Sequence, residues 1–170
     1  MPADTSLEWD PWREATWRQF GASIDMLENA INACPPDVWR SERKPEFWYI
    51  AFHTLFWLDL YLSDSLGRFA PPDPFTLDEL EAETEPAREA YTIEELQAYL
   101  DHGRAKCRAL IASLTPERVA ERCGFQWVDC TVGELLLYNM RHVQHGAAQL
   151  NLILRQQTDS APNWVKRARR

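Results

Sequence analysis

Three histidines are the side chains of this sequence best suited to chemistry. His53 lies in the middle of the most apolar stretch, 47–62, whereas His142 and His145 are three residues apart in a later stretch of helical periodicity. A neutral imidazole is a good ligand for a divalent metal ion, and spacings of three or four residues bring side chains to one side of a helix. The sequence therefore predicts a histidine site between two helices.

The same residues have a simpler interpretation. A histidine on an apolar helix is often a hydrogen-bonded core residue, and any helix can carry two histidines at this spacing by chance. On a helical wheel, aromatic and polar side chains flank the histidines and are candidate pocket walls: Tyr49, Trp57, Tyr138 and Gln149. The fourth histidine, His102, falls near an exposed face, and we expect it to be inert.

Four long helices are expected to position these side chains. Only six glycines occur in 170 residues, and apolar residues recur at spacings of three and four, which favours an all-α fold. Asp10 followed by proline predicts one helix start, and the pairs Thr92/Glu95 and Thr131/Glu134 predict capping boxes at two others. The expected core helices cover about residues 10–33, 46–66, 92–114 and 131–157.

The connections predict how these helices are arranged. The acidic, proline-rich linker 67–91 is far longer than the usual helix–helix connection of about 2–8 residues. Because it can span the length of a helix, the second and third helices can lie parallel. We therefore expect one domain over 1–170, a four-helix bundle in up-down-down-up order with one long crossover. The linker, with a short helical turn at 76–81, is expected to be a solvated loop or a lid.

Composition excludes several classes of function. The chain has 18 basic and 26 acidic residues, so its net charge of −8 disfavours nucleic acid and anionic membranes as partners. No apolar run is long enough for a membrane span, and neither a secretory signal nor a CxxC motif is evident, so we expect a cytoplasmic protein. The second helix is apolar on nearly all sides, which predicts a subunit interface and a homodimer.

Two segments resemble the DinB/YfiT-like superfamily. PEFWYIAFHTLFWLDLYL resembles its second helix, and TVGELLLYNMRHVQHGAAQLNLILRQ resembles its last helix. The resemblance covers essentially the whole domain. It implies a divalent metal held by one histidine of helix two and two of helix four, and subunits that pair through their bundles. Imidazole ligands suit Zn, Ni or Fe. Some members are transferases or isomerases that use a low-molecular-weight thiol.

One position departs from the family pattern. The resemblance assigns His53 and His142 as metal ligands, but the second helix-four ligand usually lies four residues further on, where this chain has Gly146. Either His145 takes its place, or only two ligands remain and the glycine enlarges a pocket.

These observations leave three functions open. The first is a metal-dependent hydrolase or thiol-dependent transferase with ligands His53, His142 and His145, in which the metal lowers the pKa of water or of a thiol. The second is a non-catalytic bundle that binds a small molecule beside a degenerate metal site. The third is a dimeric scaffold.

Overall fold

The computed structural model describes residues 10–81 and 89–168. The long helices are α1 (Pro11–Asn32), α3 (Phe47–Tyr61), α4 (Ile93–Ser113) and α6 (Val132–Thr158). The short elements are α2 (Pro36–Trp39), the 3-10 turns η1 (Leu66–Arg68) and η2 (Leu77–Leu80), and α5 (Pro116–Ala120). None of the helices in these ranges is long and apolar enough to cross a membrane.

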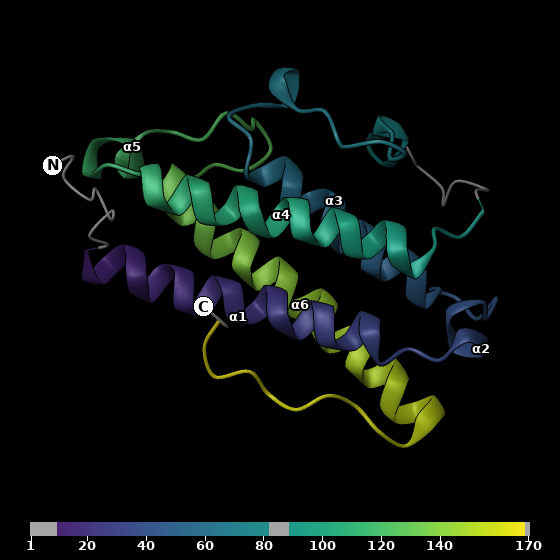
Figure 1. The fold of residues 1–170 in the computed structure, drawn as a ribbon. Coiled ribbons are helices and arrows are strands. Elements are labelled where there is room, and N and C mark those ends of the chain that lie inside the picture. Colours follow the sequence, from purple (N-terminus) through teal and green to yellow (C-terminus); the bar gives the residue numbers. More distant parts are fainter. Residues whose placement is uncertain (1–9, 82–88, 169–170) are drawn as a thin grey trace, which may run out of the picture.

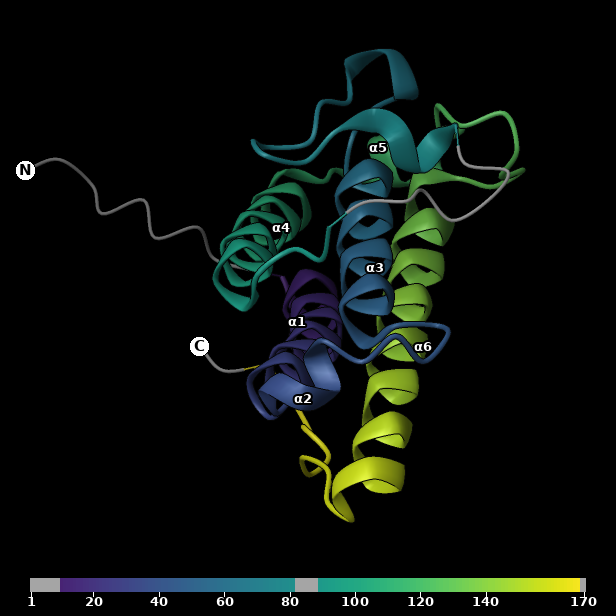
Figure 2. The ribbon, with the colours of Figure 1, turned by 90° about the vertical axis from the view of Figure 1, so that its right-hand side faces the viewer.

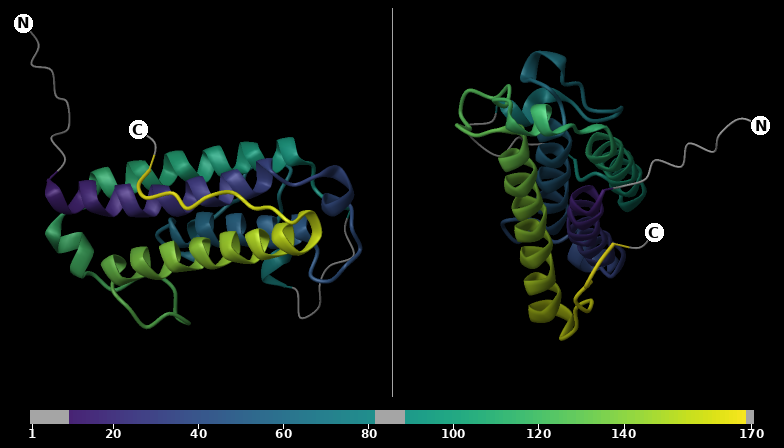
Figure 3. Two further views of the ribbon diagram at one scale, coloured as in Figure 1. Left: turned by 90° about the horizontal axis from the view of Figure 1, so that it is seen from below. Right: turned by 90° about the vertical axis from the view of Figure 1, so that its left-hand side faces the viewer.

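The four long helices form a bundle in up-down-down-up order. The chain runs in one direction through α1 and α6 and in the other through α3 and α4 (Figures 1 and 3). Each of α1 and α3 packs against both α4 and α6. The described part of the crossover after α3, up to residue 81, passes over the outer side of α3 (Figure 2). The predicted fold class and the parallel placement of the second and third helices are confirmed.

Local sequence fixes most of the helix starts. The Asp10 side chain accepts hydrogen bonds from the first free amides of α1. The side chains of Thr92 and Thr131 each accept a hydrogen bond from the backbone amide three residues further on. The carboxylates of Glu95 and Glu134 in turn accept a hydrogen bond from the backbone amides of Thr92 and Thr131. These capping boxes satisfy amide groups that have no partner within a helix.

The second long helix is shorter than expected. α3 ends at Tyr61, not near residue 66, because the chain after it is held by other segments. Ser65 forms a bridge with Gly124, and a Cβ on Gly124 would lie only 3.1 Å from the Asp64 carbonyl carbon. The glycine therefore allows the loop before α6 to press against the chain where α3 stops.

The apolar circumference of α3 is covered within one chain. One side packs on α6 and another on α4. Phe69 and Phe75 of the crossover are buried against the rest, with ring centroids 5.2 Å from Phe56 and 5.9 Å from Phe52, respectively. This coverage accounts for the pattern on which the expected homodimer rested, and the homodimer stays a prediction.

Buried ion pairs tie α4 to its neighbours. Asp59 of α3 is wholly buried, and its Oδ1 atom is 2.5 Å from Nζ of Lys106. The Tyr99 hydroxyl donates to Asp59 Oδ2 at 3.2 Å. Arg104 of α4 pairs with the buried Asp25 of α1. These contacts join α4 to both of its neighbours in the bundle, α1 and α3.

The segment after α6 returns along α1. The Ala168 amide donates to the Arg18 carbonyl at 2.8 Å, and the Gln19 side chain donates to the Lys166 carbonyl at 3.3 Å. Figure 3 shows this segment running back beside the first helix. Its backbone is thus packed on the bundle.

Candidate histidine site

His53 of α3 and His142 of α6 lie side by side between the two helices. Their ring centroids are 5.6 Å apart. The His53 side chain is 43% exposed, whereas the Nε2 atom of His142 is buried. The two helices therefore bring together two of the three histidines expected at the site.

A carboxylate from the crossover completes the arrangement. Glu79 of η2 has a side chain only 3% exposed, and its Oε1 lies 2.6 Å from His53 Nδ1. The Tyr49 hydroxyl donates to both Glu79 oxygens at 3.3 Å. The crossover reaches this depth because Phe75 is anchored among aromatic rings, stacked on Tyr99 at 4.3 Å between centroids.

The contact with Glu79 sets the hydrogen-bonding state of His53. A carboxylate accepts hydrogen bonds, so the proton of the neutral His53 ring is placed on Nδ1 by this partner. The lone pair of Nε2 is then free to accept a proton or bind a ligand. This assignment follows from the hydrogen-bond network, in which the Tyr49 hydroxyl is a second donor to Glu79.

His142 is held in its neutral form. Burial, followed by the neighbouring His53 ring, lowers the pKa of His142 to about 4. The Thr54 and His53 backbone opposes this shift, and His145 makes a smaller lowering contribution. Its Nε2 atom has no hydrogen-bond partner among the described residues. A buried polar atom without a partner is uncommon and marks a place where a ligand group or water can bind.

A shallow, wide-open groove lies along one face of α6 beside this pair, and all the residues that line it belong to α6. Its volume is about 540 Å³, and it is lined by Tyr138, Arg141, His142, Gln144, His145 and Ala148. His142 thus belongs both to the groove and to the pair with His53. Exposed Arg141 supplies a cation at its wall.

The remaining predicted site residues have different surroundings. The Trp57 ring is 6.1 Å from His53, and its Nε1 is buried without a partner among the described residues. Gln149 is exposed on α6. Gly146 is buried where α6 meets α3, and a Cβ there would lie 2.8 Å from Thr54 Cγ2 and 3.0 Å from Thr54 Cβ. The space expected beside the glycine is therefore filled by Thr54.

These donors do not fit a three-histidine metal centre. The position of Gly146 is closed to a larger side chain by Thr54, and His145 is exposed in the groove. Glu79, the carboxylate of the site, is already bonded to His53. Over 10–81 and 89–168, no group of three or more His, Cys, Asp or Glu converges closely enough to hold a metal ion.

The sequence did not single out Glu79. It is one of several acids in the linker, and Thr76 three residues before it reads as the start of a capping box. In the structure Thr76 caps η2, but the Glu79 side chain turns to His53. The large apolar residues of the linker, Phe69 and Phe75, were the available sign that this segment docks on the bundle.

Comparison with known families agrees with this architecture. The profile of the DinB superfamily matches residues 19–150. The chain therefore belongs to the DinB superfamily, whose members are four-helix bundles that in some cases bind a metal. A search of curated proteins and a search of solved structures each returned no match.

Proposed function

We propose that this protein is a thiol-dependent transferase, in which His53 removes the proton from a low-molecular-weight thiol. The observation that carries the proposal is the 2.6 Å contact between His53 Nδ1 and the buried carboxylate of Glu79. It orients a partly exposed imidazole and leaves its Nε2 as a proton acceptor.

The ordinary pKa values of the reactants favour a thiol over water. An imidazole has a pKa of about 6.5 and a thiol about 8.5, so a proton moves between them against a gap of roughly two units. Water, at about 15.7, lies some nine units above imidazole, so His53 without a metal ion deprotonates water far less readily than a thiol. The three-ligand centre that would do this is not assembled, so the geometry favours thiol transfer over hydrolysis.

The proton and the electrons can be followed through the step. The thiol proton passes to His53 Nε2, and Glu79 stabilises the imidazolium that forms. The thiolate attacks an electrophilic carbon of the second substrate and forms a carbon–sulfur bond. The leaving group departs with the bond electrons. A basic leaving group takes the proton back from His53, whereas with chloride as the leaving group the proton passes from His53 to water.

The groove over α6 is suited to a polar, acidic thiol. Arg141 can pair with a carboxylate, and Gln144 and Tyr138 provide further hydrogen-bonding groups. Neutral His142, whose Nε2 has no partner among the described residues, can accept a hydrogen bond from the bound molecule or donate one to it. These groups lie near His53, because the His142 ring both lines the groove and packs beside the His53 ring.

The proposal is tested with glutathione and cysteine as thiols and a chloronitrobenzene as electrophile. We expect the wild-type chain to accelerate the conjugation, and His53→Ala to lower the rate by about a hundredfold or more. Glu79→Gln should lower kcat with little effect on KM and change the pH profile. Glu81→Gln, an exposed acid in the same linker, is the matched control and should keep the wild-type rate.

Chelation separates this function from a metal-dependent one. Dialysis against a chelator should leave the conjugation rate unchanged. Loss of the rate on chelation, or a wild-type rate in well-folded His53→Ala, contradicts the proposal. So does the absence of acceleration with every thiol tested.

A second candidate is a non-catalytic bundle that binds a small molecule in the groove. The packing of Gly146 on Thr54 favours it, because the ligand position of the superfamily pattern is closed. Saturable binding of a thiol that depends on Arg141, without any turnover, would support this candidate over the transferase.

A further inference from the structure

Two cysteines face each other across the loop that precedes α6. The Cys123 amide donates to the Cys130 carbonyl at 3.1 Å, and the two Sγ atoms are 3.9 Å apart. Arg122 and Thr131 form an antiparallel bridge immediately outside them. The loop therefore holds two thiols in direct contact, although they are seven positions apart in sequence.

The register of this short ladder suits a covalent bond. Because Arg122 opposes Thr131, Cys123 directly opposes Cys130. The pair shares one backbone hydrogen bond, since the Cys130 amide donates instead to the Val128 carbonyl at 3.0 Å. Hydrogen-bonded opposed residues have Cα atoms roughly 5.5 Å apart. This lies inside the range of about 4.4–6.8 Å that disulfides span, so the bond needs side-chain rotation without a large backbone shift.

We propose that Cys123 and Cys130 form a reversible disulfide by exchange with a low-molecular-weight disulfide. One cysteine thiolate attacks the small disulfide, which gives a mixed disulfide and releases one small thiol. The other cysteine, as thiolate, attacks the protein sulfur of the mixed disulfide and releases the second small thiol. The protein loses two electrons and two protons overall, and the small disulfide is reduced to two thiols.

The four cysteines differ in their access to such a reagent. Cys123 and Cys130 are half-buried, whereas Cys34 and Cys107 are buried in the core. Burial and the neighbouring Cys123 raise the pKa of Cys130 to about 11, with Glu134 adding to the rise and Arg122 opposing it. Exchange at Cys130 is therefore slow at neutral pH, because the thiolate is the reacting form.

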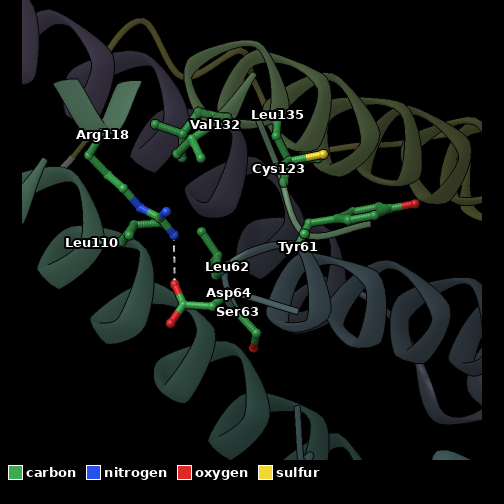
Figure 4. Close-up of a pocket in the computed structure, with 11 residues that line it drawn as sticks. Tyr61, Leu62, Ser63, Asp64, Leu110, Arg118, Cys123, Val132 and Leu135 are labelled. Carbon is green, nitrogen blue, oxygen red and sulfur yellow. Dashed lines mark hydrogen bonds and ion pairs between the residues drawn. The ribbon is translucent and has the colours of Figure 1, made fainter. Parts of the chain in front are cut away.

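The thiol pair connects to the groove through aromatic contacts. Trp127, between the two cysteines, donates through Nε1 to the Tyr61 hydroxyl at 3.2 Å. The Tyr61 ring meets that of Tyr138, a groove residue, edge-on at 5.4 Å. Figure 4 shows Cys123 beside Tyr61 and Leu135 in a small cavity. The disulfide would fix the loop that carries these contacts.

The test is incubation of the full chain with glutathione disulfide, followed by alkylation of free thiols and peptide mass spectrometry. We expect a Cys123–Cys130 link with Cys34 and Cys107 alkylated only after denaturation. The melting temperature should rise by about 5 °C, and dithiothreitol should reverse the rise. Cys123→Ser and Cys130→Ser should each accumulate a single stable glutathione adduct instead.

Several results would overturn the inference. They are mixed disulfides that persist on both cysteines of the wild type, a link that involves Cys34 or Cys107, and an unmodified loop after prolonged exposure at alkaline pH. The inference uses residues separate from the His53 and Glu79 pair, so its outcome does not depend on the transferase activity.

Discussion

Two clusters of polar side chains lie on different sides of α3. They differ in how many of their buried polar atoms have a hydrogen-bond or ion-pair partner. On the α4 side, the Asp59 carboxylate contacts Lys106, Tyr99 and, at 3.4 Å, the Nε2 atom of His102. On the α6 side, buried polar atoms have no partner among the described residues: Trp57 Nε1, Asn139 Oδ1, His142 Nε2 and Asn151 Oδ1.

This difference separates a structural cluster from a candidate binding site. A buried carboxylate with several donors is fully compensated, so the Asp59 cluster fixes how α3 and α4 pack. Unpartnered buried atoms cost folding free energy and retain hydrogen-bonding capacity that a ligand can use. Two of these residues, Trp57 and His142, have rings 6.1 Å and 5.6 Å from that of His53, which supports the assignment of function to the α6 side.

The largest expected loss of stability comes from substitution in the Asp59 cluster. Asp59→Ala leaves the Lys106 ammonium without its buried partner, so the free energy of unfolding should fall by about 3–5 kcal/mol. Chemical denaturation measures this loss. Asp64→Ala, which removes an exposed carboxylate just after α3, is the control and should cost about 1 kcal/mol or less. Equal losses in both variants would erase the distinction between the clusters.

The next effect comes from His142 and depends on pH. The unfolded chain takes up a proton at this residue below its ordinary pKa of about 6.5, whereas the folded chain does so only near a pKa of about 4. The free energy of unfolding should therefore fall as the pH drops from 6.5 to 4, by roughly 3 kcal/mol. His142→Gln should remove this part of the dependence of the free energy of unfolding on pH, which is measured by chemical denaturation at several pH values. If the variant and the wild type lose the same free energy of unfolding between pH 6.5 and 4, the burial of the His142 ring is contradicted.

A smaller effect is expected where α3 and α6 touch. Gly146→Ala forces a methyl group against Thr54 and should destabilise the protein by about 1–3 kcal/mol. Adding Thr54→Ala to this variant should recover part of the loss. Gly67→Ala is the control, because nothing lies within 4 Å of its added Cβ. A neutral Gly146→Ala would mean that the helices are farther apart than described.

Most of the fold could be predicted because its signals are local. Apolar spacing and the two threonine capping boxes set the starts of α4 and α6 to within a residue or two. The length of the linker correctly predicted the long crossover. The end of α3 was missed because it depends on Gly124, more than sixty residues away in sequence.

The site could be predicted only in part. His53 and His142 were identified from their place on apolar helix faces, and they do lie together. Glu79 was missed because its role depends on how the crossover docks, which no local pattern encodes. Likewise, Asp59 interrupts an apolar run in the sequence, and its partners come from α4 in a register that only the assembled bundle defines.

The most direct test of the central claim is the position of the proton on neutral His53. Long-range proton–nitrogen NMR of the imidazoles should place this proton on Nδ1 in the wild type and show that Nε2 is unprotonated. Glu79→Gln should weaken this preference, whereas Glu81→Gln should leave it unchanged. A wild-type His53 protonated at Nε2 would show that Glu79 does not orient the ring, and it would contradict the role of His53 as the base.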